Sequence, residues 1–247
     1  MVKKRTLFIF LILINFVICF DVKCAVFDIY PVKIFLDSKN LTDKLTIKNV
    51  DTKDLSIQIR VYSWEQDDNG NDIYEETNDI VIFPKIVQLK PSEEKVIRIG
   101  CQKSTFEKEG TYRIMVEELP PIKSDIKHGA TVSILLRVSI PVFLSPYYKK
   151  RSGNVEIAEI IDNKLVIAVS NTGNTHFIAN EVKIRGLNKS GEEIISSREN
   201  GWYILPGKRK HFSFGIDHIK ARELSKVQVV VRSDEDFKIE RWIHLEN

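Results

Sequence analysis

Histidines, paired carboxylates and a cysteine are the side chains of this sequence that could do chemistry. The five histidines do not stand at zinc-ligand spacing from one another or from a cysteine: His128, His176, His211, His218 and His244. Three carboxylate pairs lie at the ends of expected strands, where solvated or structural roles are favoured over acid–base catalysis: Glu75 with Glu76, Glu93 with Glu94, and Glu117 with Glu118. The sequence contains no phosphate-binding loop, no GxGxxG and no GxSxG nucleophile elbow. We therefore predict that the chain is not an enzyme and needs no cofactor.

One acidic turn superficially resembles a calcium-binding loop. Its oxygen-bearing residues surround Gly70: Asp67, Asp68, Asn69, Asn71 and Asp72. The twelfth position counted from Asp67 is Asn78, whereas a calcium loop closes with Glu at that position. We therefore predict a hairpin turn here and no metal site. Cys101 follows an expected strand, and we interpret it as a passive thiol.

The N-terminus has the pattern of a secretory signal peptide. The basic residues Lys3, Lys4 and Arg5 precede a largely apolar stretch of 14 residues, 7–20. That stretch is too short to span about 30 Å of hydrocarbon at about 1.5 Å per residue. Small residues near Ala25 complete the pattern, so we predict a signal peptide over residues 1–25, cleavage after Ala25, and export to the periplasm.

Removal of this segment makes the chain electrically neutral. The segment holds four of the 37 basic residues and one of the 34 acidic residues, which leaves 33 of each sign. A neutral chain offers no reason to expect a nucleic-acid partner. Cys101 is then the remaining cysteine, so no intramolecular disulfide is expected and stability must come from hydrophobic cores.

Apolar residues alternate along most of the chain, which predicts strands almost everywhere. The first half predicts strands at residues 27–36, 44–50, 55–64, 80–89, 95–100, 111–118 and 131–144. The second half predicts strands at residues 155–161, 164–170, 176–184, 201–205, 210–216, 226–232 and 237–245, with a single helical turn at 219–224. Seven short strands per half favour an all-β chain of two immunoglobulin-like sandwiches. We place the domains at residues 26–146 and 147–247.

Residues 131–144 form the most informative predicted strand. Five apolar residues share one of its faces: Val132, Ile134, Leu136, Val138 and Ile140. Pro141 cannot donate to a strand ladder, which indicates that one side of this strand is a sheet edge. A long apolar edge strand is normally an aggregation hazard, and a protein that keeps one can use it to pair with another chain. The alternative is the buried last strand of an ordinary sandwich.

Several runs of residues resemble the periplasmic chaperones of chaperone–usher pilus assembly. They are YRIMVEELPP at 112–121, RVSIPVF at 137–143, NTGN at 171–174 and YILPG at 203–207, together with the strand spacing over 27–49 and the run VIRI at 96–99. The IPVF, NTGN and LPG runs resemble the archaic branch of that family, and the resemblance covers essentially all of the exported chain. It implies an L of two immunoglobulin-like domains that lends its seventh strand to a pilus subunit, which is donor-strand complementation.

The same resemblance implies the partners and the donor residues. The partners would be pilus or fimbrial subunits and an outer-membrane usher, with no ATP, because release would come from exchange with another subunit's strand. The donor strand would comprise Val132, Ile134, Leu136, Val138 and Ile140. Full burial of an apolar side chain contributes about 1.5–3 kcal/mol, so a few such residues can hold a partner that must later be released.

Classical members of that family clamp the subunit's terminal carboxylate between an Arg and a Lys. The first position matches Lys33, which keeps the charge but loses the planar geometry of Arg. The second position matches Pro141, which cannot serve. We therefore predict an anchor made of Lys33 and Arg137, with Arg98 as a weaker candidate. The alternatives are a solvated edge lysine at Lys33 and internal roles for both arginines, with Glu117 or Glu118 as the expected partner of Arg137.

Two other functions remain open from the sequence. A secreted two-domain adhesion or structural module could polymerise through the same edge, in which case it would self-assemble. A chaperone would instead be monomeric or bound one-to-one to a subunit. An exported hydrolase would need convergent acids and histidines that the spacing does not offer.

Overall fold

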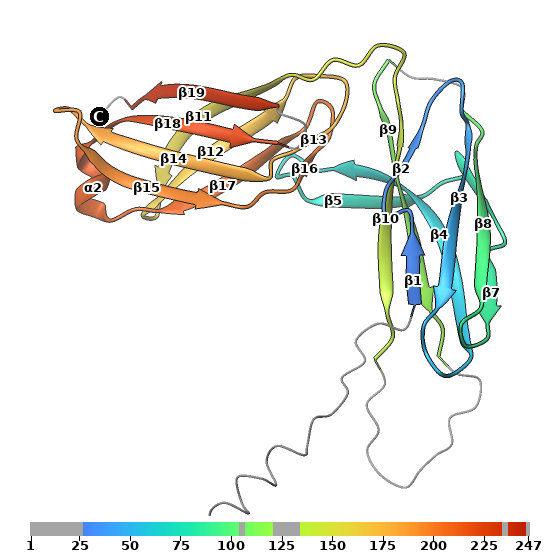
Figure 1. Cartoon of the computed structure of the whole chain (residues 1–247). Coiled ribbons are helices and arrows are strands. Elements are labelled where there is room, and N and C mark those ends of the chain that lie inside the picture. Colours follow the sequence, from blue (N-terminus) through green and yellow to red (C-terminus); the bar gives the residue numbers. More distant parts are fainter. Residues whose placement is uncertain (1–26, 104–106, 121–133, 234–236, 246–247) are drawn as a thin grey trace, which may run out of the picture.

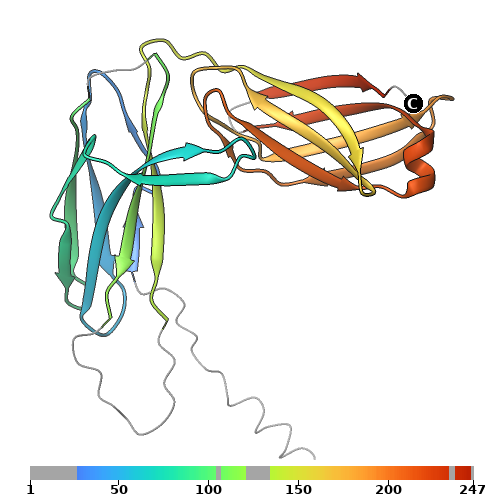
Figure 2. The same cartoon turned by 180° about the vertical axis from the view of Figure 1, so that it is seen from behind.

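The structure, a computed structural model, describes residues 27–103, 107–120, 134–233 and 237–245. These residues form two β-sandwich domains arranged as an L (Figure 1), and Figure 2 shows the same arrangement from behind. The predicted all-β fold of two immunoglobulin-like sandwiches is confirmed. The predicted signal peptide lies outside the described residues. Among the described residues, no helix is long and apolar enough to cross a membrane.

The described residues of the first domain form ten strands in two sheets. They are β1 (Phe27–Tyr30), β2 (Ile34–Leu36), β3 (Thr42–Asn49), β4 (Leu55–Gln66), β5 (Asp72–Glu76), β6 (Ile80–Phe83), β7 (Ile86–Leu89), β8 (Glu94–Cys101), β9 (Gly110–Glu118) and β10 (Arg137–Leu144). One sheet has the order β1-β3-β8-β6, and the other has the order β2-β10-β9-β4-β5 with β7 also paired to β4.

The second domain contains nine described strands and one short helix. They are β11 (Gly153–Ile161), β12 (Lys164–Asn171), β13 (Phe177–Ile178), β14 (Glu181–Asn188), β15 (Glu193–Glu199), β16 (Tyr203–Ile204), β17 (Arg209–Gly215), α2 (His218–Glu223), β18 (Leu224–Arg232) and β19 (Lys238–His244). Its sheets have the orders β11-β12-β17, β13-β16 and β15-β14-β18-β19. The predicted domain boundary at residues 146 and 147 lies between the end of β10 and the start of β11.

Two predicted strands of the first domain are each divided at a proline. The expected strand 27–36 is β1 and β2, separated at the cis bond between Tyr30 and Pro31. The expected strand 80–89 is β6 and β7, separated at the cis bond between Phe83 and Pro84. A proline has no N–H to continue a ladder, and in both places the chain crosses from one sheet to the other.

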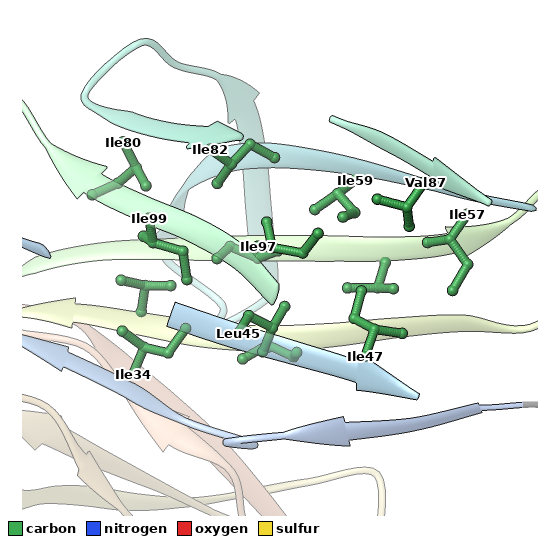
Figure 3. Packing of buried hydrophobic residues seen from close by; sticks show 14 of the residues in the cluster. Ile34, Leu45, Ile47, Ile57, Ile59, Ile80, Ile82, Val87, Ile97 and Ile99 are labelled. Carbon is green, nitrogen blue, oxygen red and sulfur yellow. The ribbon is translucent and has the colours of Figure 1, made fainter. Parts of the chain in front are cut away.

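Each sandwich has its own hydrophobic core. In the first domain, buried aliphatic side chains from both sheets meet in the space between them, as Figure 3 shows for Leu45 and Ile97 from one sheet and Ile57 and Ile59 from the other. A separate core fills the second sandwich. Burying apolar surface contributes roughly 25 cal/mol per Å², so each domain can be stable without a disulfide.

A third, smaller hydrophobic cluster joins the two domains. Trp64 and Phe143 from the first domain pack with Tyr203 and Leu205 from the second, and all four are buried. Hydrogen bonds accompany the packing, since the Gln66 side chain donates to the carbonyl of Tyr203 at 2.9 Å and accepts from the amide of Leu205 at 3.0 Å. Apolar packing and paired polar groups together hold the L at a defined angle.

Candidate functional site

One face of the sheet β2-β10-β9-β4-β5 is turned toward the second domain. Alternation along the strands sends one set of side chains into the core and the other set to the opposite side. We call the opposite set the cleft face: Lys33, Phe35, Arg60, Trp64, Arg113, Met115, Glu117, Arg137, Ser139, Pro141 and Phe143. The cleft face contacts the second domain through Trp64 and Phe143. Phe35 stacks on Phe143 with ring centroids 5.5 Å apart.

The strand β10 has a free edge over its first five residues. Along one edge β10 pairs with β9 from Arg137 to Leu144. Along the other edge β2 pairs with β10 only from Val142 to Leu144, so among the described residues no strand pairs with positions 137–141 on that side. Immediately before β10, the Ile134 side chain is 84% exposed. An uncovered strand edge next to exposed apolar residues is a template for pairing with another chain.

The predicted donor residues do not share one environment. Val132 lies outside the described residues, and Ile134 is exposed. Leu136 and Val138 are half-buried against the core of the first domain. Ile140 is 1% exposed and belongs to that core, because it lies opposite Ile114 on the core side of β9. The apolar face therefore turns progressively into the domain along β10, and Ile140 offers no surface to a partner.

The two predicted anchor residues are far apart. Lys33 directly precedes Ile34, which pairs with Val142, so Lys33 stands level with Pro141. Arg137 lies four residues before Pro141 on β10, which separates these two positions by about 13 Å at about 3.3 Å per residue. It forms an ion pair with Glu117 at 2.5 Å, which was the internal alternative. The structure does not bring Lys33 and Arg137 together.

Arg98 lies on a different surface. It is exposed on the outer face of the sheet β1-β3-β8-β6, where its register partners are Lys44 on β3 and Phe83 on β6. The other side of that sheet lines the core of the first domain. Arg98 therefore does not lie on the cleft face.

Arg113 is a candidate that the sequence analysis missed. It lies on β9 opposite Pro141, and only 4% of its surface is exposed. Its guanidinium carbon stands 3.7 Å from the Trp64 ring centroid and 5.4 Å from the Tyr203 ring centroid. Its Nε and Nη2 atoms, and Nε1 of Trp64, are buried without a hydrogen-bond partner. Burial lowers the pKa of Arg113, because the charged form is costly away from water.

Among the described residues, no carboxylate forms an ion pair with Arg113. The carboxylate that influences the pKa of Arg113 is that of Asp72, whose Oδ1 accepts a hydrogen bond from Gln66. Its Oδ2 accepts hydrogen bonds from the Tyr74 hydroxyl and from Trp202 Nε1, each at 3.1 Å. Because the Nε and Nη2 atoms of Arg113 have no hydrogen-bond partner, their N–H groups remain available to an acceptor from outside the chain.

Lys33 approaches the same place from β2. Its Nζ atom stands 5.8 Å from the Tyr203 ring centroid, and no carboxylate lies within ion-pair distance of it among the described residues. Lys33 and Arg113 therefore converge on one aromatic ring at the corner between the domains. Two cations without an anion between them have the charge needed to hold a carboxylate. The sequence feature that could have indicated Arg113 is its position between Tyr112 and Ile114, two residues of the core of the first domain.

A polar contact between the domains fixes this corner. The Oε2 atom of Glu109 accepts a hydrogen bond from the backbone amide of His176 at 2.7 Å and lies 2.6 Å from His176 Nδ1. Both side chains are almost fully buried, and the imidazole stacks on Phe143 with ring centroids 3.7 Å apart. Asn174 adds contacts to the carbonyls of Glu107 and Tyr148. These contacts hold Tyr203 where Lys33 and Arg113 reach it.

The acidic turn and the cysteine are structural. Asp67 accepts hydrogen bonds from the amides of Asn69 and Asn71, each at 2.8 Å, and the segment forms the turn of the β4–β5 hairpin. Among the described residues no cluster of His, Cys, Asp and Glu could hold a metal ion.

Cys101 is half-buried, and burial raises the pKa of its thiol, which disfavours the reactive thiolate.

Comparisons with solved structures match the whole two-domain architecture. A chain in the CsuC–CsuE chaperone–tip adhesion subunit complex from archaic Csu pili of Acinetobacter baumannii is 22% identical, with a TM-score of 0.61 over 87% of this chain and 98% of that one. The class 5 fimbriae chaperone CfaA is 18% identical, with a TM-score of 0.59 over 89% of this chain and 100% of that one. A chain in the complex of SafA pilin with the SafB chaperone from Salmonella enterica is 13% identical, with a TM-score of 0.55 over 89% and 96%.

The family comparison covers the first domain. No curated protein matches the chain. The family model described as pili and flagellar-assembly chaperone, PapD N-terminal domain, matches residues 26–149, which include every strand of the cleft face. Proteins of this family are chaperones and not enzymes, in agreement with the sequence prediction. The chain belongs to the PapD-type family of pilus-assembly chaperones.

Proposed function

We propose that this protein captures pilus or fimbrial subunits in the periplasm by donor-strand complementation and delivers them to an outer-membrane usher. The observation that carries the proposal is the free edge of β10 at residues 137–141, preceded by the exposed Ile134. A subunit that lacks its last strand needs both a row of backbone partners and apolar side chains. The described segment 134–141 combines the two.

Within this proposal the donor face is shorter than the sequence analysis expected. Val132, Ile134, Leu136 and Val138 enter the subunit's groove, whereas Ile140 stays in the chaperone's own core. Ile134 buries the most new surface because it is the most exposed of the described donor residues. Full burial of one such side chain contributes about 1.5–3 kcal/mol, which permits capture and later exchange.

The carboxylate anchor is proposed to consist of Lys33 and Arg113. A subunit's terminal carboxylate between them would give the buried guanidinium N–H groups the acceptor that they lack. Arg137 stays a predicted contact, but its ion pair with Glu117 favours an internal role. The location of the anchor at the domain corner would align the subunit's last residues with β10.

Co-expression with a pilus subunit in the periplasm tests this function. We expect a one-to-one complex on gel filtration and loss of the subunit to proteolysis when the chaperone is absent. The free chaperone should be monomeric and should not form fibres. Fibres of the chaperone alone, with no protection of the subunit, would support the self-assembling structural module instead.

A further inference from the structure

The sheet β1-β3-β8-β6 turns one face toward the core of the first domain and its other face outward. Strand register places its outward residues in rows that cross the sheet. One row joins Lys44 on β3, Arg98 on β8 and Phe83 on β6. The adjacent row joins Tyr30 on β1, Thr46 on β3 and Val96 on β8.

Lys44 and Arg98 are like charges placed directly opposite each other on neighbouring strands. Like charges directly opposite each other on neighbouring strands are destabilising. Neither cation lies within ion-pair distance of a carboxylate among the described residues. The neighbouring Asp43 accepts a hydrogen bond from the backbone amide of Lys44. The fold therefore tolerates an uncompensated positive charge at this position.

The next row of the same face shows the ordinary arrangement. Lys48 on β3 stands between Asp28 on β1 and Glu94 on β8, so opposite charges alternate across the sheet. The contrast between the two rows sets Lys44 and Arg98 apart from the usual solvated surface of a sandwich.

Large apolar side chains flank the uncompensated pair. Phe83 is 73% exposed and Tyr30 is 77% exposed, and Val96 between them is also exposed. Together with Lys44 and Arg98 they form one contiguous surface of mixed apolar and positive character, which we call the basic aromatic face. Exposed apolar surface gathered around charges of one sign is typical of an interaction site.

We propose that the basic aromatic face binds an acidic, aromatic-rich polypeptide segment of a second protein. Carboxylates of that segment would supply the negative charge that Lys44 and Arg98 lack within this chain. Its apolar side chains would cover Phe83, Tyr30 and Val96. The face adjoins the cleft face at its β1 side, where Tyr30 and Lys44 line one pocket with Lys33 and Phe35. Arg98 and Phe83 lie farther across the outer sheet, on β8 and β6.

A peptide of defined sequence tests the proposal on the full exported chain. The probe is acetyl-Asp-Phe-Glu-Phe-Asp-Ser-amide, and its counterpart carries Lys in place of each acid. We expect saturable amide shift changes in NMR spectra that centre on β3, β8 and β6 for the acidic peptide alone. Absence of saturable changes, changes on another surface, or equal binding of the basic counterpart would overturn the proposal.

Two matched variants on one strand separate the specific site from general electrostatics. Lys44→Gln should weaken binding about fivefold, since it removes one charge of the uncompensated pair, while Lys48→Gln should leave the affinity unchanged. Lys44→Glu should abolish binding while the melting temperature stays the same or rises, because it places an acid opposite Arg98. Equal effects of both Gln variants would contradict the assignment.

Phosphatidylglycerol vesicles test a different partner for the same face. If the protein bound these vesicles and not the peptide, and if Lys44→Gln abolished that binding, the face would serve a membrane surface and the proposal would be wrong.

Discussion

Lys33 and Arg113 approach the same aromatic ring, that of Tyr203, with Nζ 5.8 Å and Cζ 5.4 Å from its centroid. The two cations come from different strands of the first domain, and the ring belongs to the second. The relationship exists only because the domains are held together. It connects the rigidity of the L to the capacity of the cleft to hold a carboxylate.

The anchor makes a prediction for Arg113→Met. The thioether side chain keeps much of the volume between the rings but removes the charge, so we expect subunit capture to fall at least about tenfold. Stability should change by no more than about 1 kcal/mol, because the lost cation–π contacts are offset by removal of a buried, unpartnered charge. Co-purification with a subunit and thermal melting measure the two effects.

Arg137→Met is the matched comparison for that variant. It removes the same side-chain type from the exposed end of the cleft face and breaks only the ion pair with Glu117. We expect capture to fall much less than in Arg113→Met. A larger loss of capture in Arg137→Met would return the anchor to the residues predicted from the sequence.

A second prediction contrasts two positions of the predicted donor face. Ile134→Asp should leave the free protein folded, because the side chain is exposed, and should abolish capture by placing a carboxylate in a dry groove. Ile140→Asp should unfold the first domain, because the side chain is buried in its core. Melting curves of the two variants test the contrast. Similar melting temperatures would show that the apolar face is not divided as the structure places it.

A third prediction concerns the contact between the domains. Glu109→Ala removes the acceptor of the His176 amide and should lower stability by about 1–3 kcal/mol, with a broader range of interdomain angles in solution scattering. Glu107→Ala is the control, since Glu107 contacts Asn174 through its backbone carbonyl alone and should behave as wild type. If both variants scattered as wild type, the carboxylate would not hold the L.

A fourth prediction follows from Tyr112. Burial raises the pKa of this phenol well above its ordinary value near 10, and its hydroxyl donates a hydrogen bond to Asp79 at 3.1 Å. A raised folded-state pKa stabilises the protein below the unfolded pKa, and that stabilisation is lost as the pH rises above about 10. Tyr112→Phe should therefore flatten the alkaline loss of stability in urea unfolding. An unchanged alkaline slope in Tyr112→Phe would count against this role.

Periodicity predicted the two sandwiches because each core draws on alternating positions of many strands. It did not predict β5 or β15, since these strands carry mostly exposed or half-buried side chains and owe their conformation to pairing with β4 and β14. It also treated Pro31 and Pro84 as interior to strands, where each instead marks a change of sheet. Local patterns do not record which sheet a strand joins.

The site was harder to predict than the fold for a related reason. The basic residues near Pro141 could be compared only by position along the sequence, which favoured Arg137. The buried environment of Arg113 arises from Trp64 and from Tyr203, a residue of the other domain. Contacts between distant parts of the chain decide which cation lacks a partner, and alternation within one strand carries no such information.

Hydrogen exchange at β10 tests the central claim most directly. The measurement compares backbone amides of residues 137–140 in the free chaperone and in a complex with a co-expressed subunit. We predict that the amides pointing away from β9 exchange rapidly in the free protein and become strongly protected in the complex, because a subunit strand then covers the free edge. A stable complex in which these amides still exchange as in the free protein would contradict donor-strand complementation through β10.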